Sequence, residues 1–200
     1  RLENQVLKER LDGQMTMGDE ELNPIQVSIQ QFYGIEINDF AVTVAKTALW
    51  IAESQMLEET KSIVYGFHQD FLPLKTYVNI TEGNALRIDW NDVVPKEKLK
   101  YIMGNPPFVG TNYMSDAQRV DMDNIWGPKR GKLDYVSCWY MKAADFISDT
   151  DIQVAFVSTN SICQGEQATS LWKEILVKKE CVINFAFRTF QWDSEASEKA

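Results

Sequence analysis

Histidine and cysteine are scarce in this sequence of 200 residues. His68 is the single imidazole, and Cys138, Cys163 and Cys181 are three scattered thiols. Zinc sites need ligands at close paired spacings and disulfide frameworks need paired cysteines, so the sequence supports neither. We therefore expect no metal site, and cysteines that are buried or inert.

Long apolar runs are also missing. No stretch approaches the roughly 20 apolar residues of a membrane helix, and the first residues lack the basic-then-apolar pattern of a secretory signal. With 44% hydrophobic and 24% charged residues, the composition is that of an ordinary folded domain with one substantial core. We expect one domain, no membrane contact and a cytoplasmic location.

Basic charge is in deficit. The sequence has 20 lysines and arginines against 29 aspartates and glutamates, which gives a formal net charge of −9. Binding to a polyanion such as DNA depends largely on basic side chains that displace phosphate counterions. If this chain acts on DNA, we expect segments outside it to supply most of the grip.

The sequence does contain a regular alternation of short apolar strands and amphipathic helices. A strand at 31–37 leads through Asn38 and Asp39, an expected helix N-cap, into a helix with apolar residues at helical spacing from Phe40 to Ala52. Such units build parallel sheets, so the expected fold is α/β, with a doubly wound, mostly parallel sheet that binds ligands beyond the carboxyl ends of its strands. Further strands are expected at 77–80, 99–103, 153–158 and 181–187, further helices at 2–11, 135–146 and 171–176, and an aperiodic connection at 109–132.

The strongest motif follows the expected strand at 99–103 and consists of Asn105, Pro106, Pro107 and Phe108. Consecutive prolines fix two φ angles and bias the residue before each toward extended backbone, so the loop is stiff. That stiffness suits a site where the Asn105 side-chain oxygen and the Pro106 carbonyl accept hydrogen bonds from one exocyclic amine. Phe108 is placed to stack on a base turned out of a duplex. Pro-Pro also occurs in plain loops, so a rigid turn without chemistry is the alternative.

This loop resembles the hallmark of the DNA amino-methyltransferases, in which Asn, Asp or Ser is followed by Pro-Pro and an aromatic residue. The resemblance implies a Rossmann-like class I methyltransferase fold. It also implies transfer of a methyl group from S-adenosylmethionine to the exocyclic amine of a flipped base in double-stranded DNA. Because Asn105 stands where cytosine-specific enzymes usually have serine, the resemblance favours adenine N6 over cytosine N4.

Two further segments resemble the cofactor-binding motifs of this family. Glu36 and Ile37 end the strand at 31–37, where the family has an acidic residue that accepts both ribose hydroxyls of the cofactor. Asn84 and Ala85 stand in the turn Glu-Gly-Asn-Ala-Leu, where the family recognises the cofactor's adenine. A surface carboxylate and an ordinary turn residue are the alternative interpretations.

The resemblance continues through residues 132–135, 156–160 and 185–190 and is closest to the large type IIG restriction–modification enzymes. Phe190 and Trp192 lie just past the expected strand at 181–187, where either is a candidate for a second wall against the flipped base. Core packing is the commoner role of aromatics near a strand end.

The compact basic cluster beside the loop consists of Lys129, Arg130 and Lys132. These side chains either contact DNA phosphates or belong to a solvated loop.

No glycine-rich turn precedes Phe32, although the family has one after its first strand to wrap the methionine part of the cofactor. We therefore interpret residues 1–200 as the central and C-terminal part of one methyltransferase catalytic domain, truncated before or within its first strand–helix unit. We expect this segment alone to be inactive and to bind the cofactor weakly.

Two other functions are compatible with the sequence. A protein-glutamine N5 methyltransferase presents a similar Asn-Pro-Pro-aromatic loop to a side-chain amide, which carries the same NH₂ group. A non-catalytic nucleotide-binding domain keeps the fold without turnover, and an intact glycine turn upstream would count against it.

Overall fold

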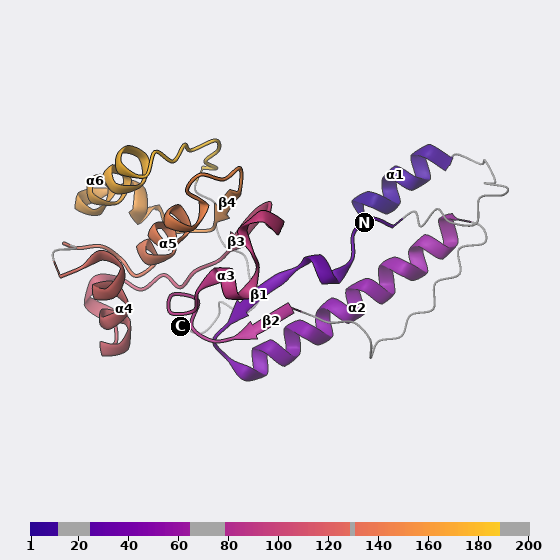
Figure 1. Ribbon diagram of the computed structural model, residues 1–200, viewed down its shortest axis with the longest axis horizontal. Helices are drawn as coiled ribbons and strands as arrows, with labels where there is room; N and C mark the ends of the chain where they lie inside the picture. The colour runs from indigo at the N-terminus through magenta and orange to yellow at the C-terminus, as the bar shows by residue number, and fades with distance from the viewer. Residues whose placement is uncertain (12–24, 65–78, 129–130, 189–200) are drawn as a thin grey trace. The chain divides into compact units, whose positions relative to one another are not determined.

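The computed structural model describes residues 1–11, 25–64, 79–128 and 131–188. The chain divides into two compact units, Arg1–Val94 and Pro95–Ala200. Within the described residues, each unit combines helices with one pair of parallel strands, so the mixed α/β class is confirmed (Figure 1). None of the helices in these ranges is long and apolar enough to cross a membrane.

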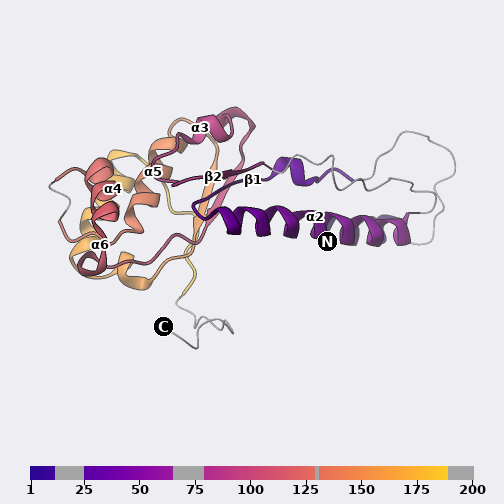
Figure 2. The ribbon, with the colours of Figure 1, turned by 90° about the horizontal axis from the view of Figure 1, so that it is seen from below.

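The first unit contains a parallel strand pair and a long helix. Strand β1 pairs with β2 so that Glu36 lies opposite Glu82, and α2 packs along this pair (Figure 2). The predicted N-cap is confirmed, because the Asn38 side-chain oxygen accepts the N–H of Ala41 at 2.9 Å. The elements are α1 (Leu2–Leu11), a 3-10 helix (Ile29–Gln31), β1 (Tyr33–Glu36), α2 (Asp39–Ile63), β2 (Asn79–Glu82) and α3 (Trp90–Val93).

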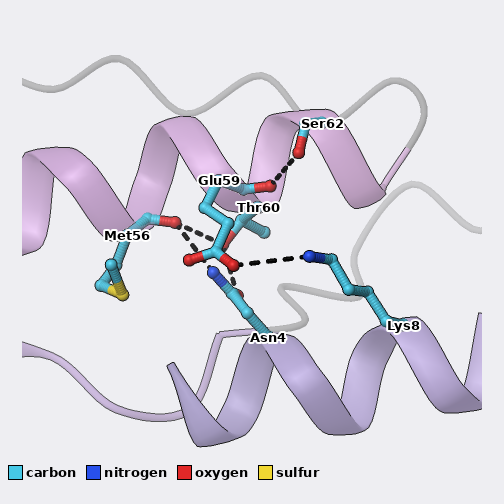
Figure 3. A network of polar contacts seen from close by, with 6 residues as sticks. All are labelled: Asn4, Lys8, Met56, Glu59, Thr60 and Ser62. Atoms are coloured by element: carbon cyan, nitrogen blue, oxygen red, sulfur yellow. Dashed lines mark hydrogen bonds and ion pairs between the residues drawn. The ribbon is translucent and has the colours of Figure 1, made fainter.

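A polar network fastens α1 to α2 (Figure 3). Asn4, only 4% exposed, donates from its amide to the Met56 carbonyl at 3.2 Å. The Thr60 hydroxyl donates to the Asn4 amide oxygen at 2.8 Å, and Lys8 pairs with Glu59 at 3.6 Å at the edge of the contact. Because both ends of the buried amide are hydrogen-bonded, the unit avoids a desolvation cost of about 1–3 kcal/mol.

The predicted helix after Asn38 is confirmed, but the apolar stripe that indicated it is not the face that packs within this unit. Phe40, Val44 and Ile51 are 73%, 49% and 53% exposed, whereas Val42 and Leu57 on the same helix are buried. Helical spacing therefore identified the element without identifying the side that contacts the rest of the unit.

The second unit holds the larger core. Strand β3 pairs with β4 in parallel, with Gly104 opposite Phe156. Helices α4 and α5 pack together through Met122 and Cys138, whose sulfur atoms lie 3.1 Å apart in the interior. The elements are a 3-10 helix (Lys96–Lys98), β3 (Tyr101–Gly104), a 3-10 helix (Thr111–Tyr113), α4 (Asp116–Trp126), α5 (Ser137–Ile147), β4 (Gln153–Phe156), a 3-10 helix (Asn160–Cys163), α6 (Gly165–Trp172) and a π-helix (Lys173–Lys178).

Helix α4 corrects the expectation of an aperiodic connection at 109–132. The Ser115 hydroxyl oxygen caps the helix by accepting the N–H of Gln118, and the Gln118 side-chain oxygen accepts the N–H of Ser115 at 2.9 Å. Gly127, with a φ of 77°, ends it. Caps at both ends define this helix. Asp121 and Met122 are its only buried residues, so apolar periodicity gave too weak a signal.

The last predicted strand, at 181–187, is wrong for the residues that the structure describes. These residues form no strand, and Val182, Phe185 and Phe187 are 79%, 76% and 70% exposed. A strand requires a neighbour to complete its hydrogen bonds, and composition alone does not supply one. Of the other expected strands, 31–37, 99–103 and 153–158 are confirmed with shifted ends, and 77–80 begins outside the described residues and continues as β2.

Candidate functional site

The Asn-Pro-Pro-Phe loop leaves the carboxyl end of β3. The strand's last carbonyl, on Gly104, accepts the N–H of Val157 at 3.0 Å, which fixes the start of the loop to the residue that follows β4. Pro106 is buried, whereas Asn105 is exposed and Phe108 is 46% exposed. The loop is therefore anchored by a proline and presents an amide and an aromatic ring to the outside.

The far end of the loop is fixed to the segment that precedes α5. The Val109 carbonyl accepts the N–H of Tyr135 at 2.9 Å, and the Thr111 hydroxyl donates to the Leu133 carbonyl at 3.3 Å. Leu133 and Tyr135 are buried, at 1% and 4% exposure. Sequence reasoning missed this support, because contacts made by backbone groups place no demand on residue type.

Tyr140 of α5 lies against the carboxyl end of β4. Its hydroxyl shares a hydrogen bond of 2.9 Å with the Ser158 hydroxyl, and its ring packs edge-on against Phe156 and Trp172. Burial raises the pKa of Tyr140 above its usual value of 10.0, and the bond with Ser158 partly opposes that shift. Tyr140 is therefore a neutral hydrogen-bonding group at physiological pH.

In the first unit, Glu36 ends β1 and is half-buried. One of its carboxylate oxygens accepts the N–H of Asn38 at 3.0 Å. Ile37, the next residue, is 68% exposed. The predicted carboxylate therefore stands at the carboxyl end of a parallel strand, where α/β folds bind ligands.

The turn after β2 brings the second predicted cofactor segment beside the first. The N–H of Gly83 donates to the Glu36 carbonyl at 2.8 Å, with a φ of 151° at the glycine. The Asn84 side-chain oxygen accepts the N–H of Leu86 at 2.9 Å, and the Ala85 carbonyl accepts the indole N–H of Trp90 at 2.9 Å. The Asn84 side chain thus helps to shape the turn. An amide oxygen has two lone pairs, so it can accept a second hydrogen bond.

The remaining predicted residues differ in where they lie. Lys132 is exposed and its ammonium group lies 3.2 Å from the Glu166 carboxylate. Phe190, Trp192, Lys129 and Arg130 lie outside the described residues.

Thiols and metal ligands form no cluster in the part of the chain that the structure describes. Cys138 is buried, Cys163 is exposed and Cys181 is intermediate, and all three are free. No three His, Cys, Asp or Glu side chains within the described ranges are grouped so as to hold a metal ion.

Comparison with known proteins gives consistent matches. Residues 1–200 match the family model described as MmeI, DNA-methyltransferase domain. The chain is 46% identical over 178 residues to DNA methyltransferase A of Bacillus subtilis (strain 168). The aligned region covers 87% of this chain and 20% of that protein. The chain is also similar to a solved structure of the type IIL restriction-modification enzyme MmeI in complex with DNA, with 42% sequence identity and a TM-score of 0.85.

This structural match covers 98% of the present chain and 26% of the MmeI chain. The chain therefore spans about a fifth of the curated relative and about a quarter of the solved one. Because the family model extends over all 200 residues, including the Asn105 loop and the Glu36 strand end, the chain belongs to the family of MmeI DNA-methyltransferase domains.

Proposed function

We propose that this chain supplies the methyl-acceptor loop of a DNA methyltransferase that methylates adenine N6 within a restriction–modification enzyme. The observation that carries the proposal is the exposed Asn105 side chain on a loop that is hydrogen-bonded at both of its ends. An accessible amide on a fixed backbone is what the alignment of a small amine requires. Membership of a DNA-methyltransferase family favours a base over a protein glutamine as the acceptor.

The adenine amino group is a poor nucleophile, because its lone pair is delocalised into the ring. In this proposal the Asn105 side-chain oxygen and the Pro106 carbonyl accept its two hydrogens and draw the nitrogen toward a tetrahedral geometry. Phe108 offers a partly exposed ring on which the flipped base stacks. These residues act through alignment and hydrogen-bond acceptance, so no strong base is needed.

The methyl donor in this proposal is S-adenosylmethionine, which supplies an electrophilic sulfonium methyl group when bound. The residues of the first unit suit such a group, because the Glu36 carboxylate and the turn at Asn84 stand at adjacent strand ends. Glu36, beside Ile37, would hold the ribose hydroxyls, and Asn84 with Ala85 would contact the adenine. A carboxylate accepts several hydrogen bonds, so the bond from Asn38 leaves acceptor capacity at Glu36.

We also propose a fold and a partner for this chain. Parallel strand pairs with following helices are the components of a doubly wound, Rossmann-like class I domain, of which residues 1–200 would form the central and C-terminal part. Without a glycine-rich turn before Phe32, the chain alone is proposed to be inactive. The partner is double-stranded DNA in the cytoplasm.

A net charge of −9 supports the proposal that segments outside this chain supply most of the grip on DNA. Lys132, Lys129 and Arg130 stay predicted phosphate contacts, and Phe190 or Trp192 a predicted base contact.

Replacing Asn105 tests the proposal. In the full-length protein, Asn105→Ala should abolish methyl transfer to DNA while leaving the fold intact, because the loop is held by backbone contacts that this substitution does not touch. Transfer of a labelled methyl group to DNA measures activity, and mass spectrometry of digested nucleosides distinguishes N6-methyladenine from N4-methylcytosine. The matched control is Asn112→Ala, which removes an exposed amide a few residues after the motif. Activity retained by Asn105→Ala would remove the assignment.

A further inference from the structure

Hydrogen bonds close a ring of segments that includes the Asn105 loop. At the loop's start, the Gly104 carbonyl accepts from Val157, and at its end the Val109 carbonyl accepts from Tyr135. Both partners then lead toward one side chain, Asp134. It directly precedes Tyr135, and its carboxylate accepts the hydroxyl of Ser161, four residues after Val157, at 2.9 Å. The two anchors of the loop are thus joined to each other through the Asp134 carboxylate.

A second element fixes the same carboxylate. The Gln167 amide of α6 donates to Asp134 Oδ2 at 2.8 Å, and its oxygen accepts the Asp134 N–H at 3.0 Å. Gln167 is only 8% exposed, so its amide is held by a two-bond contact in a largely water-excluded place. Asp134 Oδ2 therefore accepts two hydrogen bonds from two separate segments.

The carboxylate also lies against the loop directly. A methyl group built on Gly110 would meet Asp134 Oδ1 at 3.7 Å, ordinary van der Waals distance. Gly110 comes two residues after Phe108, so Asp134 borders the stretch that follows the motif.

Capping of the next helix does not explain the position of this side chain. Aspartate is a common N-cap, but the N-cap of α5 is Val136, and α5 has no side-chain cap. The Asp134 carboxylate instead reaches Ser161 and Gln167, which belong to the segment after β4 and to α6.

We propose that Asp134 is a positioning residue for the methyl-acceptor loop, acting through Tyr135 and Val109 on the orientation of Asn105. The inference rests on the proposed function of Asn105. Its physical basis is that small displacements of an aligned group cost rate, whereas binding of the substrates depends on other contacts.

The first test compares Asp134→Ala with Asp134→Asn in the full-length protein. Alanine removes the acceptor shared by Ser161 and Gln167, so kcat for DNA methylation should fall by about 10- to 100-fold, with the KM values for DNA and S-adenosylmethionine little changed. The asparagine oxygen can still accept both donors, so this variant should recover most of kcat, to within about fivefold of wild type. Asp151→Ala, which removes an exposed carboxylate just before β4, is the control and should behave as wild type.

The second test measures the local stability of the loop in the absence of substrates. Hydrogen–deuterium exchange of the same variants, without substrates, should be faster at the amides of residues 108–111 in Asp134→Ala and unchanged in α4. Unchanged exchange at 108–111 would overturn the inference even if activity fell. So would a raised KM for S-adenosylmethionine with normal kcat, which would place Asp134 in cofactor binding.

Ser161→Ala keeps the inference testable if Asp134→Ala does not fold. It removes one of the two donors to Asp134 and should lower kcat by a smaller factor than Asp134→Ala. The double variant should match Asp134→Ala, because Asp134→Ala already breaks the contact that Ser161→Ala removes. The proposed link through Asp134 would be contradicted by a wild-type kcat in Ser161→Ala. It would also be contradicted if the loss of kcat in the double variant equalled the product of the two single losses. If the Asp134 variants have wild-type activity while Asn105→Ala is inactive, the role of Asp134 is refuted and the proposed function stands. If Asn105→Ala is active, the proposed function is refuted.

Discussion

A buried hydrogen bond joins α4 to the segment that leads into α5. Tyr135 donates its phenolic O–H to Asp121 Oδ2 at 2.8 Å, with both residues buried at 4% and 3% exposure. The same Tyr135 holds the end of the Asn105 loop through its backbone N–H. Tyr135→Phe removes the hydroxyl and keeps the ring, so it isolates the side-chain bond from the packing and from the backbone contact.

The magnitude follows from the character of this bond. Loss of a buried hydrogen bond to a carboxyl group costs about 1–3 kcal/mol, and the phenyl ring retains the edge-on contact with Trp139. Since each 1.4 kcal/mol is a factor of ten, the opening equilibrium that exposes α4 should rise by about 5- to 140-fold.

Native-state hydrogen exchange in the full-length protein measures this change, because it reports the local opening of α4 separately from global unfolding. Amides of α4 should exchange faster in Tyr135→Phe by the stated factor. Tyr113→Phe is the matched control: Tyr113 is 86% exposed, so removal of its hydroxyl should change stability by less than about 0.5 kcal/mol. Wild-type exchange rates in α4 of Tyr135→Phe would show that this hydrogen bond does not stabilise the position of α4.

Three further changes test the proposed cofactor segment, the turn after β2 and the core. Glu36→Ala should raise the KM for S-adenosylmethionine by about 10- to 100-fold, with a smaller change in kcat, because a carboxylate accepts stronger hydrogen bonds from hydroxyls than a neutral acceptor does. An unchanged KM would contradict the proposed role of Glu36. Gly83→Ala should destabilise the β2 turn by about 1–3 kcal/mol, because its φ is 151° and the new Cβ would lie 2.3 Å from the end of Ile88. Hydrogen exchange at the turn measures this, and adding Ile88→Val should recover part of the loss. Because burial raises the pKa of Tyr140, its phenol contributes stability that is fully present below pH 10.0 and lost as pH rises through the folded-state pKa. Difference absorbance between wild type and Tyr140→Phe during alkaline titration should show a tyrosine that ionises late, and a midpoint at or below 10.0 would contradict the shift.

Local signals predicted the elements where they were strong and failed where they were weak. The N-cap at Asn38 and the apolar strand before Asn105 were both visible in residue types, and both elements are confirmed. Helix α4 was missed, because its caps at Ser115 and Gly127 carry its signal while few of its residues are buried. The strand expected at 181–187 failed for the opposite reason, since apolar composition does not provide a pairing partner.

The sequence by itself determined which groups are candidates for the site: an amide followed by two prolines and an aromatic ring, and a carboxylate at the end of a strand. Residue type and order suffice there, because proline restricts its own backbone and side-chain chemistry travels with the residue. Only the tertiary structure decided what holds those groups. The bonds from Val157 and Tyr135 to the loop are made by backbone atoms that every residue has. Asp134 contacts Ser161 and Gln167, which lie up to 33 residues away in the sequence. Packing of the folded chain brings these residues together, and no local sequence pattern indicates the contact.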